Sequence, residues 1–178
     1  FILQPFQGDR FQLLDPSVGV EGTVFEQGAF TYWARYEALL PLSYTSRQEG
    51  LIVAPQAMQS VELRLPGTRL KSEIWVIPTL KIFQQQAPSL ALYLSPRLIY
   101  SLSDSFSLIS LLEYSLATEA GKQLLSLTRS GDWSLGFGFR YASSNGEGLW
   151  IHPFWNFYPE GTLASSSHLG LFFGGPLL

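Results

Sequence analysis

The sequence contains no cysteine, which excludes disulfide scaffolds, thiolate metal sites and cysteine nucleophiles. Charge is scarce as well, since Asp, Glu, Lys and Arg make up 14% of the residues, against roughly 25% in an average soluble domain. The 11 basic residues form no patch of the kind that binds nucleic acid. We therefore expect no nucleic-acid partner, and the composition is unlike that of an ordinary globular enzyme with a charged surface.

Long hydrophobic runs are also missing. Ser, Gln, Arg or Pro interrupts each apolar stretch within a few residues, so none has the roughly 18 residues that a transmembrane helix needs. This excludes a helical membrane protein. A membrane β-barrel remains open, because each of its strands needs only about 9–11 residues of alternating polarity.

What the chain has in quantity is apolar and aromatic side chains. Apolar residues account for 46% of the chain and aromatic residues for 15%, and the mean hydropathy is +0.13. So apolar a composition rules out a disordered chain. The 178 residues are enough for one domain that encloses a core or a lumen.

Apolar residues alternate with small or polar ones along most of the chain from about residue 58 onward. Residues 89–102 follow this pattern, with leucine at most even positions and small or polar residues at most odd positions. The clearest case alternates Trp133, Leu135, Phe137, Phe139 and Tyr141 with Ser134, Gly136, Gly138 and Arg140. A period of two residues places the two kinds on opposite faces of a strand. The pattern predicts an all-β protein.

Turn signals such as Pro66-Gly67 and Asn145-Gly146 separate the alternating segments. Residues 43–57 fit no strand well, although 51–54 could form a short one, as could 11–14. We expect an N-terminal segment over residues 1–17, as a tail, plug or extra strand, and a β-barrel over 18–178. About ten strands are predicted, with 8–12 possible, near residues 18–25, 30–41, 59–65, 72–83, 89–102, 104–117, 122–130, 132–143, 148–158 and 164–173.

Three prolines, Pro78, Pro96 and Pro153, fall inside the predicted strands. Proline has no backbone N–H, so each one removes a hydrogen bond from the ladder between strands. We therefore expect a β-bulge or a shifted strand boundary at each of them.

The charged residues in these strands share one face, opposite the apolar one, with Arg129 as the exception. They are balanced, with five acids and five bases: Glu21, Glu37, Glu62, Glu73 and Glu113, and Arg35, Arg64, Lys81, Arg97 and Arg140. A face in water needs no such balance, whereas an unpaired charge in a confined interior is costly. The balance favours an arrangement in which the apolar face points outward and the polar face surrounds a narrow, filled lumen.

Aromatic residues mark both ends of the predicted strands. Trp133 and Tyr141 share one face and lie about 19 Å apart along the axis of a tilted barrel. That distance is close to the spacing of two aromatic girdles around an apolar band of about 25 Å. We assign four residues to these girdles: Trp133, Tyr141, Tyr100 and Tyr114.

With these features the chain resembles the bacterial outer-membrane β-barrel proteins. The resemblance rests on the alternating strand at 133–142, its aromatic ends and the tail Leu169-x-Leu171-x-Phe173, and it covers about residues 18–173. It implies a closed antiparallel up-and-down transmembrane β-barrel in the bacterial outer membrane, without cofactor or metal. The expected partner is the lipid bilayer, with lipopolysaccharide as a further candidate. In such a barrel seven residues would pair in the lumen or line a narrow pore: Arg35, Glu37, Glu62, Arg64, Arg97, Glu113 and Arg140.

Two other functions stay open. One is a lipid-modifying enzyme of the outer membrane, in which His152 or His168 activates a serine of the run 165–167. That chemistry also needs an orienting acid, which Glu113 or Glu160 could supply only through the fold, so a hydrogen-bonded lumen histidine is favoured. Two histidines alone do not indicate a metal site. The other function is a soluble lipocalin-like protein whose apolar face encloses a hydrophobic ligand. The sequence leaves the oligomeric state open.

Overall fold

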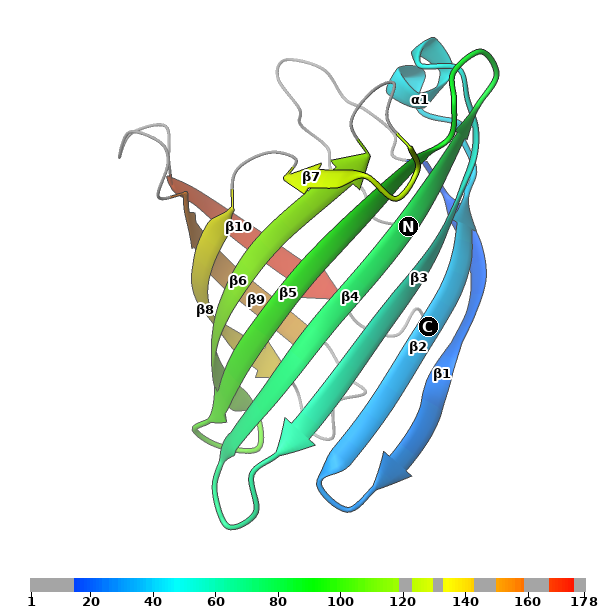
Figure 1. Cartoon of the computed structure of the whole chain (residues 1–178). Helices are drawn as coiled ribbons and strands as arrows, with labels where there is room; N and C mark the ends of the chain where they lie inside the picture. The colour runs from blue at the N-terminus through cyan, green and yellow to red at the C-terminus, as the bar shows by residue number, and fades with distance from the viewer. Residues whose placement is uncertain (1–14, 119–122, 130–132, 143–149, 159–166, 175–178) are drawn as a thin grey trace.

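The computed structural model describes residues 15–118, 123–129, 133–142, 150–158 and 167–174. In this part the chain is all-β apart from one short helix, α1 (Tyr44–Gln48), and no helix is long and apolar enough to cross a membrane. Ten strands form a single sheet (Figure 1): β1 (Ser17–Gln27), β2 (Phe30–Leu39), β3 (Leu51–Arg64), β4 (Leu70–Phe83), β5 (Ser89–Ser101), β6 (Phe106–Thr118), β7 (Leu127–Arg129), β8 (Ser134–Ala142), β9 (Trp150–Phe157) and β10 (Ser167–Gly174).

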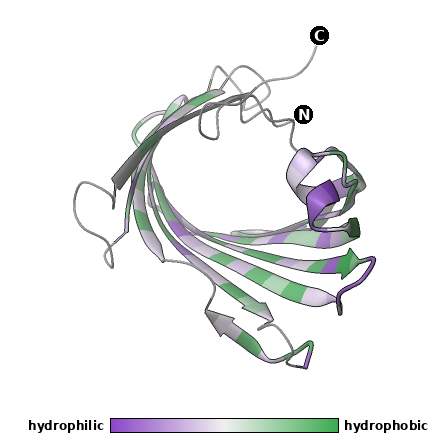
Figure 2. Ribbon diagram, turned by 90° about the horizontal axis from the view of Figure 1, so that it is seen from above, coloured by the Kyte–Doolittle hydropathy of each residue, from purple (hydrophilic) through white to green (hydrophobic). Residues whose placement is uncertain are grey.

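The strands follow the chain order across the sheet, and neighbouring strands are antiparallel. The short β7 is a side branch that pairs with β6, so the path continues from β6 to β8. Seen from above, the sheet is strongly curved, with one convex and one concave face (Figure 2). The predictions of an all-β fold and of antiparallel up-and-down strands are confirmed. Among the described residues β1 and β10 form no pair with each other, so closure of the barrel stays a prediction.

Several predicted boundaries need correction. The segments predicted at 51–54 and 59–65 are parts of one continuous strand, β3, and the strand predicted at 122–130 is reduced to the three residues of β7. Helix α1 was not expected. It begins after Ser43, whose side chain accepts a hydrogen bond from the Ser46 backbone N–H. The segment 1–14 lies outside the described residues.

The prolines do not shift the strands, contrary to expectation. Pro78 lies opposite Leu92 within an unbroken register between β4 and β5. Pro96 lies between two pairs that β5 forms with β6, Leu94–Tyr114 and Arg97–Leu111. The two pairs have the same register, so there is no bulge at Pro96. Each proline therefore leaves one carbonyl without its ladder partner but moves no side chain to the other face.

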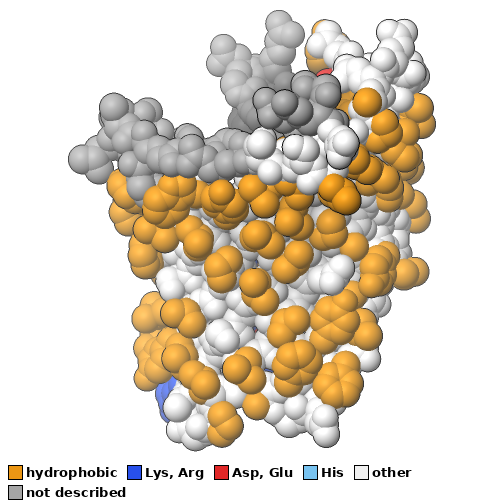
Figure 3. Space-filling model, viewed as in Figure 1, with side chains coloured by type: hydrophobic (Ala, Val, Ile, Leu, Met, Phe, Trp, Pro, Cys, Tyr) orange, Lys and Arg blue, Asp and Glu red, His pale blue; other side chains and the backbone are white. Residues whose placement is uncertain are grey.

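The two faces of the sheet differ sharply in polarity. The convex face carries large apolar side chains that are exposed, for example Val20 at 72% and Leu98 at 53%, and Figure 3 shows them spread over the visible surface. On the concave face, Ser95 and Ser134 are 0% and 1% exposed. The concave face is called the interior from here on. A soluble β-protein has the opposite arrangement, with apolar side chains enclosed and polar ones in water.

Large and small residues alternate across the interior. One register row crosses β2 to β5 as Trp33, Ser60, Trp75 and Ser95. The serines leave room for the two indole rings, whose centroids lie 5.6 Å apart. Small side chains between large ones are the usual pattern on the inner face of a narrow barrel, and this row follows it.

Candidate functional site: the polar interior

Every charged residue that the sequence assigned to the polar face lies in the interior by strand register. The longer strands add Glu26, opposite Thr31, and Lys71, opposite Arg64. With these two, the described strands place six acids and six bases in the interior. Arg129 lies in β7, and its side chain is outside the described part of the structure.

The first ionic cluster joins β1, β2 and β3. Arg35 lies 3.4 Å from the Glu21 carboxylate and 2.5 Å from that of Glu37. Glu37 is buried and also accepts a hydrogen bond from the side chain of Gln56. This carboxylate is therefore held by one ion pair and one hydrogen bond, which offset the cost of its burial.

The second ionic cluster lies where β3 and β4 meet. The Glu62 carboxylate contacts the Arg64 Nε at 2.8 Å and the Lys71 Nζ at 2.7 Å. Only 14% of the Glu62 side chain is exposed, whereas 63% of the Arg64 side chain is. Two cations thus hold one nearly buried carboxylate at this end of the interior.

Glu113 is the centre of a third, neutral-donor cluster. Its carboxylate accepts hydrogen bonds from the Tyr93 hydroxyl at 2.5 Å, the Ser134 hydroxyl at 2.8 Å and the Asn156 side-chain amide at 3.3 Å. These donors come from β5, β8 and β9, so the cluster joins strands far apart in sequence. The other side-chain atom of Asn156, Oδ1, is buried and has no hydrogen-bond partner among the described residues.

Arg97 is held by an aromatic ring. Its Cζ lies 4.9 Å from the centroid of the Trp75 ring, and its Nε donates to the Ser95 hydroxyl at 3.2 Å. Glu73 is its neighbour across the strands, but within the described part of the chain the two form no ion pair. A cation over the face of an indole is stabilised by the ring quadrupole, by about 2 kcal/mol where it is desolvated.

Of the seven predicted lumen residues, the structure brings four together as direct ion pairs: Arg35 with Glu37, and Glu62 with Arg64. Arg140 lies in the interior opposite Ser107. The sequence analysis missed the neutral partners of the other residues: Tyr93, Ser134, Asn156, Trp75 and Ser95. The alternating pattern placed Tyr93, Ser95 and Ser134 on the polar face. It could not predict their contacts, because these depend on the register between strands.

The predicted aromatic girdle residues lie at different heights. Tyr141 contacts Phe106 with ring centroids 5.2 Å apart, at the turn that joins β5 to β6, and Tyr100 belongs to the same end. Trp133 immediately precedes β8 and therefore lies at the end opposite Tyr141. Tyr114 lies inside β6, opposite Leu94, and not at a strand end.

The two histidines are placed by register alone. His168 in β10 lies opposite Asn156, and His152 in β9 lies opposite Phe172. Their side chains, the serines 165 and 166, and Glu160 are outside the described part, so the enzyme hypothesis stays untested. No group of three or more His, Asp or Glu residues that could hold a metal occurs among the described residues.

Comparison of the chain with protein-family models, with curated proteins and with solved structures finds no match.

Proposed function

We propose that this chain is a small integral outer-membrane β-barrel with a charge-paired, mostly filled lumen, acting as a structural barrel or a narrow pore. The observation that carries the proposal is the polarity of the two faces. The convex face is apolar and exposed, and the charged side chains described in the nine strands of the main path belong to the interior.

An exposed apolar face of this extent is costly in water. Monomeric soluble proteins rarely expose apolar patches larger than a few hundred Å², whereas here exposed apolar residues extend from β1 to β10. Strands β1 to β6 have 10–14 residues each, enough to cross the hydrocarbon core, which takes about 9–11. A bilayer is the solvent that fits such a surface.

The interior supports a filled lumen and not a wide channel. A barrel of about eight strands has an interior just wide enough for side chains to fill. Nine strands follow one another in this sheet. Trp33, Trp75 and Tyr93 all belong to the interior, together with the ionic clusters. Any conducting path is therefore narrow and lined by paired charges.

The proposal includes closure of the sheet into a barrel, because open sheet edges do not occur in the hydrocarbon region of a bilayer. Nine alternating strands make β1 and β10 run in the same direction. A direct β1–β10 seam would be parallel, and an antiparallel closure requires one further strand. Either seam pairs the backbone groups of both edge strands.

The face polarity disfavours the lipocalin-like alternative. That function needs an apolar interior to hold a hydrophobic ligand. Here the interior contains Glu37, Glu62 and Glu113 with their hydrogen-bond donors, and the apolar face is convex.

Gel mobility of the detergent-extracted protein in SDS, with and without boiling, tests the proposal. A closed barrel resists SDS at room temperature and unfolds on boiling, so we expect two mobilities. A protein that is soluble without detergent and shows one mobility would place the apolar face in water and overturn the proposal.

A further inference from the structure

Two arginines and two serines form a row at one end of the interior, where short turns join β1 to β2, β3 to β4 and β5 to β6 (Figure 1). Arg69 directly precedes β4, and its carbonyl oxygen accepts a hydrogen bond from the Ser101 backbone N–H at 2.9 Å, which continues the β4–β5 register by one residue. We call this set the mouth row. Each member is the register partner of the next: Arg69, Ser101, Ser107 and Arg140.

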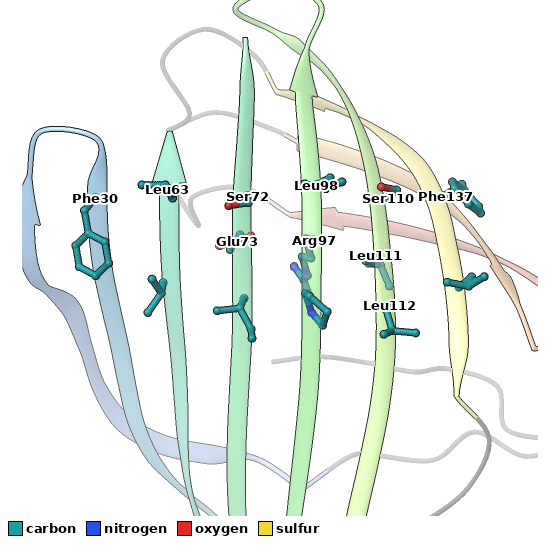
Figure 4. Close-up of a pocket in the computed structure, with 14 residues that line it drawn as sticks. Phe30, Leu63, Ser72, Glu73, Arg97, Leu98, Ser110, Leu111, Leu112 and Phe137 are labelled. Carbon is teal, nitrogen blue, oxygen red and sulfur yellow. The ribbon is translucent and has the colours of Figure 1, made fainter. Parts of the chain in front are cut away.

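The mouth row belongs to the concave face. Figure 4 shows Leu98 of β5 and Ser110 of β6, register partners that line a groove on the convex face. Ser101 and Ser107 each lie three residues from one of these two, and an odd separation along a strand puts side chains on opposite faces. The hydroxyl oxygens of the two serines are 3.5 Å apart. The serines therefore form the centre of the mouth row.

The two arginines at its ends are exposed. Arg69 donates from Nη1 to the Leu102 carbonyl oxygen at 2.5 Å, which brings its guanidinium to the β5 side. Within the described ranges, neither Arg69 nor Asp104, the acid of the β5–β6 turn, forms an ion pair. The Cα atoms of the two arginines are three strand spacings, or about 14 Å, apart. Because the sheet curves toward this face (Figure 2), side chains from both ends converge on the serines.

An apolar layer lies directly below the mouth row. Ile99 and Ile109 are register partners on the same face, two residues deeper, and each is 8% exposed. An anion at the serines has water on one side and this layer on the other. The low dielectric of the layer strengthens its attraction to the guanidinium groups.

We propose that the mouth row binds one phosphate-class oxyanion, with an arginine at each end and the two serine hydroxyls donating between them. Guanidinium groups match oxyanions in geometry as well as in charge, and a hydroxyl adds a neutral donor. Because the row lies on the concave face, the expected ligand is a water-soluble anion. The inference goes beyond the proposed function, since it needs the pairing of β4, β5, β6 and β8 but neither a conducting lumen nor a closed barrel.

Isothermal titration calorimetry of the detergent-solubilised full chain with inorganic phosphate, at constant ionic strength, tests the site. We expect wild type to bind one phosphate per chain. Arg69→Gln and Arg140→Gln should each weaken binding by about tenfold or more, because each removes hydrogen bonds between charged groups. The matched control is Arg47→Gln, in α1 at the opposite end of the sheet, which should bind phosphate as wild type does.

Three results would overturn the inference: no saturable phosphate binding by wild type; equal affinities of wild type and both arginine variants; or retention of phosphatidylglycerol in place of inorganic phosphate, which would put the ligand in the lipid. Far-UV circular dichroism shows whether each variant folds. Ser107→Ala removes one hydroxyl and no charge, so it tests the same site if an arginine variant does not fold.

The two proposals can fail separately. A boiling-dependent gel shift without phosphate binding refutes the mouth-row site alone. Phosphate binding by a protein that shows one mobility and is soluble without detergent refutes the proposed function alone.

Discussion

At the scale of single residues, the interior carboxylates depend on neutral donors as much as on cations. Glu113 is held by a tyrosine, a serine and an asparagine, and Glu37 by a glutamine as well as Arg35. A carboxylate in a low dielectric stays charged only where donors replace its water. Each of these neutral donors therefore contributes to the stability of the fold, although it forms no ion pair.

Removing the shortest of the Glu113 bonds should weaken the fold. Tyr93→Phe deletes the hydroxyl 2.5 Å from the carboxylate, and a hydrogen bond to a charged group contributes about 1.5–3 kcal/mol. We expect a loss of that size in the free energy of unfolding, measured by urea titration in detergent with tryptophan fluorescence. Tyr100→Phe, on the exposed convex face, should change it by less than about 0.5 kcal/mol. Equal losses in the two variants would contradict this role of Tyr93.

At the scale of elements, alternation predicted most of the strands and grouped their residues on two faces, because a period of two is fixed by strand geometry. It did not predict the first half of β3 or the shortness of β7. Register was not predictable, because it depends on contacts between strands. Glu113 illustrates this, since its face followed from the sequence but its contacts with Tyr93 and Ser134 did not. Helix α1 escaped prediction because its five residues are too few to show a helical period.

The pairing of β1 with β2 requires a glycine at one position. A Cβ on Gly19 would overlap the Tyr36 carbonyl oxygen and lie 2.5 Å from the Glu37 Cβ. Gly19→Ala should therefore push the two strands apart and cost about 1–3 kcal/mol in the free energy of unfolding. Gly22→Ala in the same strand is the matched control, since a Cβ on Gly22 would meet no atom within 4 Å. A Gly22→Ala protein as unstable as Gly19→Ala would refute the close approach as the cause.

Asp15 anchors α1 to the start of β1. Its carboxylate accepts hydrogen bonds from the Ser43 backbone N–H at 2.6 Å and from the Ser46 hydroxyl. Partial burial raises the pKa of this carboxyl, but the hydrogen bonds from Ser46 and Ser43 lower it more, so that the pKa is below its usual value of 3.8. Because the folded pKa is lowered, the anchor is fully stabilising above about pH 3.8 and is lost as the pH falls through the folded pKa.

An NMR titration of the Asp15 carboxyl measures this directly. We expect a pKa below 3.8 in wild type and a higher pKa in Ser46→Ala, which removes one hydrogen bond. Thr45→Ala leaves both hydrogen bonds in place and should leave the pKa of Asp15 unchanged. A wild-type pKa at or above 3.8 would show that the anchor does not form.

At the scale of the whole molecule, the acids and bases on the concave face of the described strands are balanced in number. Eight of the twelve charged residues that the described strands place there belong to two ionic clusters, the Glu113 cluster and the Arg97–Trp75 contact, distributed over β1 to β9. We expect such an interior to resist the passage of ions, because most of these charges are already held by a neighbour. The N-terminal segment predicted over residues 1–17, as a tail, plug or extra strand, lies mostly outside the described residues, and its role stays a prediction.

Planar-bilayer conductance tests the filled lumen. Wild type should conduct close to zero. Arg97→Ala removes the side chain that lies over Trp75 in the interior and should give a measurable increase, as should Arg140→Ala near the end of β8. Unchanged conductance in both variants would contradict a lumen closed by these side chains.

The central claim is that the convex face meets lipid and the concave face does not. Because the chain has no cysteine, a single introduced cysteine can be spin-labelled without background. In lipid vesicles, labels at Leu92, Leu94 and Leu98 of β5 should be accessible to molecular oxygen dissolved in the bilayer and protected from a water-soluble nickel chelate. Labels at Ser95 and Arg97, between them, should be shielded from oxygen. Collision rates with no such alternation, or leucine positions open to the nickel chelate, would contradict the account.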